Sequence, residues 1–481
     1  MGLTSKWFLP PPKPGSPDAW CFKESITYDL KVYVIVAEYY KRIADLVSSL
    51  QKGDEVFIVS WGIFGALDLG GITLQDLLLK AANIQEVKVR ILQSRDRISD
   101  KDVKDKSNDF VDYLKNLLLS QNIKNNIEYI TDLSLVQSHQ KAVYIRKKEY
   151  QYLFVGGMDL MAMGTYNRID VQVEVTDFGA RDGLQTILER WNDLSPNKID
   201  YNSPYYQNVQ VEKNGIVCQL QFVRSYPSQT HDPNSNRHYA NNGDFTYYHL
   251  ISRAIKLANK SIYIEDQFFQ QMGVPHSTKN QIIDSNLYDR HYLPELPPSL
   301  DHILFTYKQK IPNFVVFSQD YLHSDLFRSI KQAGRYFPKS IKFNIADNPG
   351  INEVNLDLGK QALEVHSKTW IFDDEFVLIG SGNYWVNSFI ERPNPPQGEY
   401  LYAEFGVAIV PISASDEYFG FQNLSFAKAL RLRMWERLKQ VHNSQYHFDR
   451  SKIGNFRGEY NELTSRITLP NNKIIGPFVE I

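Results

Sequence analysis

Two periods of apolar and polar residues follow one another repeatedly along the chain. Short apolar runs rich in β-branched and aromatic residues, such as 55–61 and 368–372, are typical of buried strands. Apolar residues at spacings of three and four predict helices, and the first such pattern covers about 30–50. Because strand and helix patterns alternate, the sequence predicts an α/β protein built on a sheet.

The same order of elements occurs twice. In the first half, strands are predicted at 55–61, 87–92, 141–145, 152–155 and 170–175, and helices at 30–50, 74–82 and 180–191. In the second half, strands are predicted at 217–223, 261–264, 313–317, 340–345, 368–372, 376–379 and 404–410, and helices at 247–258, 326–333 and 426–440. Between them, residues 192–209 are rich in Asn, Ser, Pro and Asp and lose apolar periodicity, which indicates a boundary. We therefore expect an irregular arm at 1–20, a first lobe at 21–200 and a second at 201–481.

Composition excludes several classes of protein. The 481 residues include 53 Lys and Arg against 55 Asp and Glu, and this net charge of −2 argues against a protein that coats nucleic acid. Two cysteines, Cys21 and Cys218, are too few for a disulfide framework or a cysteine zinc site. No apolar run is long enough for a signal-peptide core or a membrane span, so we expect a soluble protein.

The most informative repeat is a short polar pattern. In the first half, His139 and Lys141 open a strand, and after a turn a second strand ends at the glycine-rich corner 156–159, which closes with Asp159. In the second half, the same pattern runs from His366 and Lys368 to the corner 380–383, which closes with Asn383. Residues two apart on a strand share one face, so each half presents His and Lys together.

These residue types suit chemistry on a phosphodiester. An imidazole can attack phosphorus or donate a proton near neutral pH, and a neighbouring lysine supplies a cation for phosphate oxygens. A glycine corner lets the backbone and an amide side chain approach the same oxygens. Two copies supply the two histidines that a double-displacement mechanism requires.

The chain resembles the phospholipase D superfamily, whose signature is two His-x-Lys-x4-Asp motifs. Further segments, such as 262–269 and 430–435, look like those of eukaryote-like phospholipases D that cleave phosphatidylcholine. The resemblance covers nearly the whole chain. It implies two α/β/α sandwich lobes, related by a pseudo-twofold axis, with the active site at their interface.

The resemblance also implies roles for individual residues. His139 would be the nucleophile that forms a phosphohistidine and His366 the acid, with the reverse order as the alternative. Asp170 would orient His139, and Glu404 would orient His366. The residues expected to bind the phosphoryl group or other parts of the substrate are Lys141, Lys368, Asn383, Asp159, Gly157, Ser381 and Gln267.

One position departs from the signature. The acid of the first motif should lie at position 146, where this chain has Arg146, whereas the second motif has Asp373. The position falls in a turn at the far end of the strand, where a carboxylate is better placed to tie the turn than to touch phosphate. We therefore expect activity to be retained.

The resulting hypothesis is a phospholipase D that hydrolyses phosphatidylcholine-like glycerophospholipids to phosphatidic acid and a head-group alcohol, and that also transfers the phosphatidyl group to small alcohols. The alternatives are a nuclease or other phosphodiesterase of the same superfamily, and a catalytically degenerate lipid-binding protein. We expect no metal or cofactor, because two lysines and two histidines already supply positive charge. We also expect a monomer that binds phospholipid at a membrane surface and does not bind nucleic acid. The expected location is the cytoplasm, or outside the cell after export by a signal-less route.

Two long segments, 270–300 and 384–402, lack periodicity and are expected to be functional or mobile loops. Aromatic residues in and near them either line an apolar mouth for lipid tails or pack in the ordinary way. They are Phe268, Phe269, Tyr288, Tyr292, Tyr384, Trp385 and Phe389.

Overall fold

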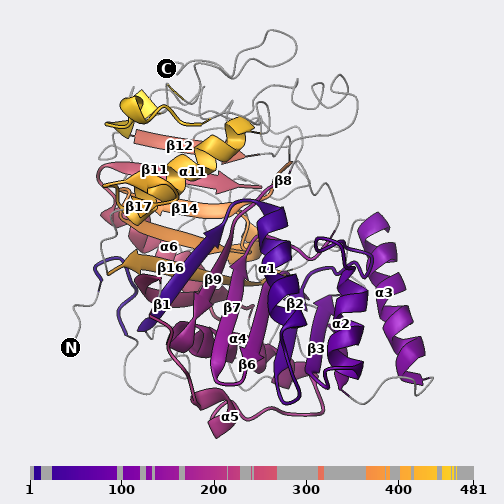
Figure 1. Cartoon of the computed structure of the whole chain (residues 1–481). Helices are drawn as coiled ribbons and strands as arrows, with labels where there is room; N and C mark the ends of the chain where they lie inside the picture. Colours follow the sequence, from indigo (N-terminus) through magenta and orange to yellow (C-terminus); the bar gives the residue numbers. More distant parts are fainter. Residues whose placement is uncertain are drawn as a thin grey trace, which may run out of the picture.

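The computed structural model shows a mixed α/β protein with one large sheet (Figure 1). The described residues are 5–11, 24–94, 101–119, 126–132, 136–161, 168–213, 215–227, 240, 243–267, 313–318, 364–384, 386–389, 401–412, 417–440, 447–456, 458–459 and 462. The sheet has 14 strands and runs through both halves of the chain.

The first half supplies one side of this sheet, in the order β1-β9-β7-β6-β2-β3-β4. The strands are β1 (Glu24–Tyr33), β2 (Glu55–Ser60), β3 (Lys88–Ser94), β4 (Ile127–Asp132), β6 (Ala142–Lys147), β7 (Tyr150–Gly156) and β9 (Gln172–Thr176). Two short strands, β5 (Val136–Ser138) and β8 (Arg168–Ile169), pair with strands of the second half.

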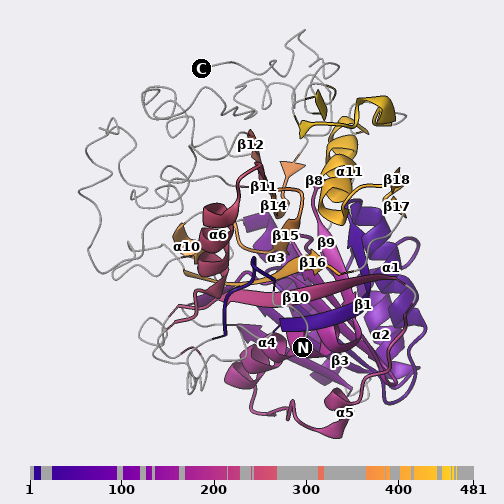
Figure 2. The ribbon, with the colours of Figure 1, turned by 90° about the vertical axis from the view of Figure 1, so that its left-hand side faces the viewer.

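The second half supplies the other side, in the order β10-β16-β15-β14-β11-β12. These strands are β10 (Ile216–Ser225), β11 (Ser261–Asp266), β12 (Asn313–Ser318), β14 (Lys368–Phe372), β15 (Phe376–Gly380) and β16 (Leu401–Pro411). Antiparallel pairing of β1 with β10 joins the two sides, and Figure 2 shows these strands next to each other. Read outward from this pair, the strands that carry the repeated pattern follow the same order on both sides.

The remaining strands are short. They are β13 (Glu364–Val365), which pairs with β8, and the hairpin of β17 (Glu417–Tyr418) with β18 (Phe421–Gln422).

Helices cover both faces of the sheet (Figure 1). They are α1 (Val36–Ser48), α2 (Leu74–Asn83), α3 (Lys101–Leu119), α4 (Asp177–Leu194), α5 (Pro204–Gln207), α6 (Thr246–Leu257), α10 (Val386–Phe389) and α11 (Phe426–Gln440), with a 3-10 turn at Arg450–Lys452. Apolar residues of α1 and α2 pack against Val143 and Ile145 of β6. Those of α4 and α11 belong to a core that contains Tyr144 of the same strand. Alternation along β6 therefore separates the two helical layers.

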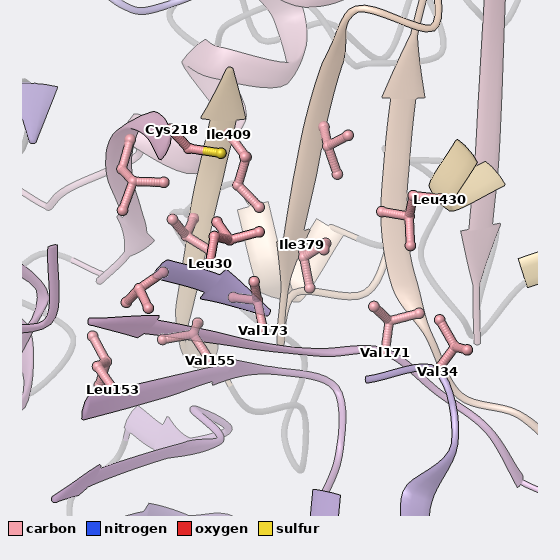
Figure 3. Close-up of a cluster of buried hydrophobic side chains, with 14 of the residues drawn as sticks. Leu30, Val34, Leu153, Val155, Val171, Val173, Cys218, Ile379, Ile409 and Leu430 are labelled. Atoms are coloured by element: carbon pink, nitrogen blue, oxygen red, sulfur yellow. The ribbon is translucent and has the colours of Figure 1, made fainter. Parts of the chain in front are cut away.

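The core that contains α4 and α11 crosses the boundary between the halves. Figure 3 shows side chains of the first half, such as Leu30 and Val173, gathered with Cys218, Ile379 and Leu430 of the second. Cys218 is a free cysteine in this core, and burial raises the pKa of its thiol. Because both halves bury apolar area in one cluster, separating them would expose it to water.

The segment 5–11 lies against the second half of the chain. Trp7 stacks on Phe376 with 5.3 Å between ring centroids, and the side chain of Gln221 bonds both the amide and the carbonyl of Leu9. Within the arm expected at 1–20, residues 5–11 thus form a segment that packs against the second half.

Several predicted elements differ from the structure. The helix expected from residue 30 is wrong at its start, because Glu24–Tyr33 is a strand whose buried positions alternate, and α1 begins only at Val36. Helix α3 and strand β4 were not predicted. The elements expected at 326–333 and 340–345 and the loop at 270–300 lie outside the described residues. Within the described residues, no helix is both long and apolar enough to cross a membrane.

Candidate active site

Each histidine of the repeated pattern lies on a segment that pairs with the other half of the chain. Strand β5, just before His139, pairs in parallel with β16, and the His139 amide donates to the Ala403 carbonyl over 3.0 Å. Strand β13, just before His366, pairs with β8, and the His366 amide donates to the Ile169 carbonyl over 2.8 Å. Both histidines are thereby fixed at the junction of the two halves.

This exchange of strands determines which carboxylate meets which histidine. Nδ1 of His139 lies 3.0 Å from both carboxylate oxygens of Glu404, and Nδ1 of His366 lies 2.8 Å from Oδ2 of Asp170. The predicted pairs, His139 with Asp170 and His366 with Glu404, are therefore wrong. The carboxylate follows its histidine in the sequence of each half, but the histidine segment crosses to the neighbouring half and meets the other carboxylate.

The two carboxylates are themselves held by hydrogen bonds. Glu404 accepts from the hydroxyls of Ser381, at 2.6 Å, and Ser388, at 2.7 Å. Asp170 accepts from the backbone amide of Val171 at 2.8 Å. Burial raises the pKa of Asp170 to about 7, although Lys368 and Arg168 oppose the shift. The hydroxyl of Ser381, predicted to bind substrate, thus orients Glu404 in this structure.

The two lysines point into the same buried region. Lys141 is 2% exposed and its ammonium donates to the carbonyl of His139 over 3.0 Å. Lys368 is fully buried and donates to the carbonyl of His366 and to Oε1 of Gln267, the latter over 3.2 Å. Burial, together with repulsion from Lys141 and Arg168, lowers the pKa of Lys368 to about 7. The cations of Lys141, Lys368 and Arg168 thus repel one another in a buried region from which water is largely excluded.

These cations also act on the histidines. Burial lowers the pKa of His139, and Lys141 and Lys368 lower it further, while Glu404 opposes them. Burial and the charges of Arg168, Lys368 and Lys141 hold the pKa of His366 well below its usual value. Both imidazoles are therefore neutral at pH 7, each with Nδ1 facing a carboxylate and Nε2 available for chemistry.

The glycine corners bring the remaining predicted residues to the same place. A Cβ at Gly157 would lie 2.1 Å from Oδ1 of Asp170, so this position requires glycine. Asp159 lies at ion-pair distance from Lys141, Arg168 and His366, at 3.5, 3.6 and 3.8 Å. Asn383 of the second corner is buried.

Sequence reasoning missed three residues around the histidines. Arg168 precedes Asp170 by two residues and lies 3.6 Å from Asp159, and its charge is the largest electrostatic influence on His366. At the other histidine, the ring of Tyr402 lies 5.2 Å and that of Trp61 6.1 Å from the His139 ring, measured between centroids. Arg168 and Tyr402 both lie two residues before the orienting carboxylate, and this shared spacing was a usable signal.

A carboxylate ties the hairpin turn to the neighbouring segment in both halves, but it lies at different positions. In the second half, Asp373 accepts from the backbone amides of Asn259, Lys260 and Ser261, which lead into β11. In the first half, Asp54 before β2 accepts from the amide of Lys148 in the hairpin turn, over 2.6 Å. The carboxylate that ties the turn therefore lies in the hairpin itself in the second half and just before the neighbouring strand in the first half.

The prediction that position 146 falls in a turn is wrong, because Arg146 lies within β6 and pairs with Gln151, and the turn follows at 148–149. The Arg146 guanidinium lies 3.8 Å from the centroid of the Tyr205 ring. The missing aspartate therefore leaves a tied turn, and the site residues of the first half stay in place.

The aromatic residues proposed for a lipid-accepting mouth are only partly described. Tyr384 and Phe389 are fully buried and pack in the core around α6, Trp370 and Phe372, so for them the alternative of ordinary packing is correct. Phe268, Phe269, Tyr288, Tyr292 and Trp385 lie outside the described residues. Over the described part of the chain, no group of three or more His, Cys, Asp or Glu side chains has the geometry to hold a metal ion.

Comparison with known proteins gave distant structural likenesses only. No protein-family model and no curated protein sequence matches the chain. Among solved structures, it is similar to a phosphatidylserine synthase from Haemophilus influenzae, with 11% identity, a TM-score of 0.47 and 88% of each chain covered. It is also similar to a polyphosphate kinase from Porphyromonas gingivalis, with 10% identity, a TM-score of 0.41, and 88% of this chain and 57% of the kinase covered. At these scores neither likeness bears on function, which is argued from the site itself.

The crossed pairing can be tested by nuclear magnetic resonance of the imidazole nitrogens. Glu404→Gln should change the tautomer and titration of His139 and leave those of His366 nearly unchanged, because only His139 faces that carboxylate. Asp170→Asn should change His366 and spare His139. The opposite pattern would support pairing within each half.

The role of the motif acid predicts a stability effect. Asp373→Asn should lower the free energy of unfolding by about 1–3 kcal/mol, because three amides lose a charged acceptor. The Asp373→Asn variant should lose far less catalytic turnover than a variant in which His139 or His366 is replaced. Urea unfolding and turnover of the same sample measure both, and Asp54→Asn is the matched change in the first half. A large loss of turnover with unchanged stability would place Asp373 in the chemistry instead.

Proposed function

We propose that this protein is a phospholipase D-type phosphodiesterase that cleaves glycerophospholipids between phosphate and head group. One observation carries the proposal: two neutral histidines from opposite halves, each held at Nδ1 by a carboxylate of the other half, meet beside two buried lysines. This set supplies a nucleophile, an acid and cations for the phosphoryl oxygens without any further group.

The first step is attack by one imidazole on phosphorus. We assign it to His139, as the sequence resemblance implies. Its Nδ1 hydrogen is held by Glu404, which leaves the lone pair of Nε2 for phosphorus, and the flanking rings of Tyr402 and Trp61 limit rotation of the imidazole. The new N–P bond replaces the bond from phosphorus to the head-group oxygen. Lys141, Lys368 and Asn383 hold the phosphoryl oxygens.

The second histidine handles protons. His366, with Asp170 at Nδ1, donates a proton to the departing head-group oxygen. It then removes a proton from water, whose oxygen attacks phosphorus and breaks the N–P bond. The products are phosphatidic acid and the free alcohol, and His139 is restored. A small alcohol in place of water gives a phosphatidyl alcohol from the same intermediate.

Both imidazoles are neutral at pH 7, which suits the nucleophile, whereas the acid must first gain a proton. A bound phosphodiester brings a negative charge next to the cations that lower the pKa of His366. Substrate binding should therefore raise that pKa and draw in the proton that the acid needs. A phospholipid substrate, in preference to nucleic acid, is supported by the net charge of −2, since tracking a nucleic acid backbone requires a basic surface.

The proposal predicts the products and the residues that make them. Purified protein in chelator should release choline from phosphatidylcholine vesicles, and adding a primary alcohol should yield a phosphatidyl alcohol. His139→Ala and His366→Ala should each lose on the order of 10⁴-fold or more in turnover, because each removes a group that acts directly on the reacting atoms. The measurement is choline release with mass detection of the lipid product.

Two further samples separate the alternatives. Single-stranded DNA in the same buffer tests the nuclease, which would cleave it in a histidine-dependent way. Gln85→Ala, which removes a side chain that donates to the Ser48 carbonyl outside the candidate site, serves as a surface control that should keep full turnover. Absence of turnover on both substrates would leave a lipid-binding protein and reject the enzyme.

The charge of Lys368 predicts the alkaline side of the pH profile. Its pKa of about 7 means that the cation is present below pH 7 and is lost as pH rises, so kcat/KM should fall above about pH 7. On the acid side, kcat/KM should fall as His139 takes up a proton and loses the lone pair that attacks phosphorus, at a pH below the ordinary imidazole range because its pKa is lowered. Lys368→Arg keeps the cation at all these pH values and should make the alkaline fall of kcat/KM shallower, leaving only the fall that proton uptake by His366 causes, while the acid limb remains. An unchanged alkaline limb in this variant would exclude Lys368 as its source.

A further inference from the structure

The two glycine corners differ in charge at the position that faces the reacting group. The first corner ends in Asp159 and the second in Asn383, and both side chains are buried. Asp159 is 1% exposed, with Oδ1 3.5 Å from the Lys141 ammonium and Oδ2 3.6 Å from the Arg168 guanidinium. Oδ2 also lies 3.8 Å from Nε2 of His366, the nitrogen that faces the substrate. A carboxylate thus occupies the space among the cations that bind an anion.

The backbone keeps this carboxylate in place. The hydroxyl of Tyr40 in α1 donates to the carbonyls of Asp159 and Met161, at 2.8 and 3.2 Å. Among the described residues, neither carboxylate oxygen of Asp159 accepts a hydrogen bond. Its neighbours hold it by charge alone and at distances longer than a hydrogen bond, so a phosphoryl oxygen that binds them must lie close to it.

From this geometry we infer that Asp159 makes the site selective for monoanionic phosphodiesters over dianionic phosphomonoesters. The inference rests on the proposed function, because it concerns the same phosphoryl site. Coulomb repulsion is proportional to the charge of the ligand, so the carboxylate opposes a dianion about twice as strongly as a monoanion. Because Asp159 is buried, water screens its charge only weakly, so the difference in repulsion between a dianion and a monoanion is retained.

This selectivity has a consequence for turnover. A phosphodiester carries one negative charge, whereas hydrolysis of the phosphohistidine by water yields a monoester with a second ionisable oxygen. That oxygen loses its proton near pH 6, so at pH 7 and above the product is largely a dianion. Asp159 then repels the product more than it repelled the substrate, which favours release of the lipid phosphate over its retention among three cations.

If Asp159 had only a structural role, its removal would change the binding of anions in a different way. If the carboxylate only held Arg168 and Lys141 in position, its removal would disorder both cations and weaken every anion alike. If it opposes charge, its removal strengthens anion binding, and most strongly for the dianion. The ratio of two affinities therefore distinguishes the roles.

The test uses inorganic phosphate as the dianion and dimethyl phosphate as the monoanion, both at pH 8, with binding to the full chain measured by calorimetry. Wild-type protein should bind dimethyl phosphate at least as well as phosphate. Asp159→Asn, which keeps the shape and removes the charge, should bind phosphate on the order of tenfold or more tighter and dimethyl phosphate by a smaller factor. Asp182→Asn is the matched control, because Asp182 bonds Ser25 and Arg181 instead of the site residues, and it should change neither affinity.

Each outcome is decisive. A wild-type preference for phosphate at pH 8 overturns the inference without any variant, so failure of Asp159→Asn to fold would not rescue it. An equal change, or none, for both ligands in Asp159→Asn also overturns it and leaves the proposed function standing. If neither anion binds wild-type protein at pH 8, nor at pH 6, where Lys368 carries its charge, the phosphoryl site is absent and the proposed function fails with the inference.

Discussion

The pairing of two short strands across the halves is the constraint on which the site depends. Strand β5 pairs with β16 and strand β13 with β8, and each pairing fixes the backbone amide of the histidine that follows. As a result, His139 is oriented by Glu404 and His366 by Asp170. Neither half contains a histidine together with its own carboxylate partner. A complete site therefore exists only when both halves are folded against each other, and the core shared between them stabilises that arrangement.

The shifted pKa values have one common cause, which is burial of many charged groups in one place. Taking Lys368 out of water and placing it near Lys141 and Arg168 disfavours its cation, and the same cations disfavour protonation of His366. Burial disfavours the Asp170 carboxylate in turn. Such an arrangement is costly without a ligand, because buried charges lose hydration that their neighbours only partly replace. The cost is a reason to expect a bound anion to stabilise the protein, since its negative charge would compensate these buried cations.

The sequence predicted local features well and relations between the halves poorly. Strand β14 and helix α11 begin and end where their apolar periods predicted, since both patterns are uninterrupted. The start of α1 was misplaced because Val32 in β1 lies four residues before Val36 and so extends the helical spacing of α1 back into the strand. The repeated pattern identified the histidines and lysines, yet not the exchange of carboxylates, because spacing along a chain carries no information on which half a segment pairs with. Arg168 and Tyr402 were missed for the same reason, since each acts on a histidine of the other half.

The two halves also show which parts of the repeated pattern are chemical and which are architectural. His and Lys recur in both halves at the same spacing, as the proposed phosphoryl chemistry requires. The motif acid recurs only as Asp373, while in the first half Asp54 ties the equivalent turn from the neighbouring strand. A hydrogen bond between two segments can be made with the acceptor on either one, so this position is free to change once the other segment supplies the carboxylate. The residue that closes each corner, Asp159 or Asn383, lies between these cases, because in our proposal its charge alters which anion binds while both corners fold alike.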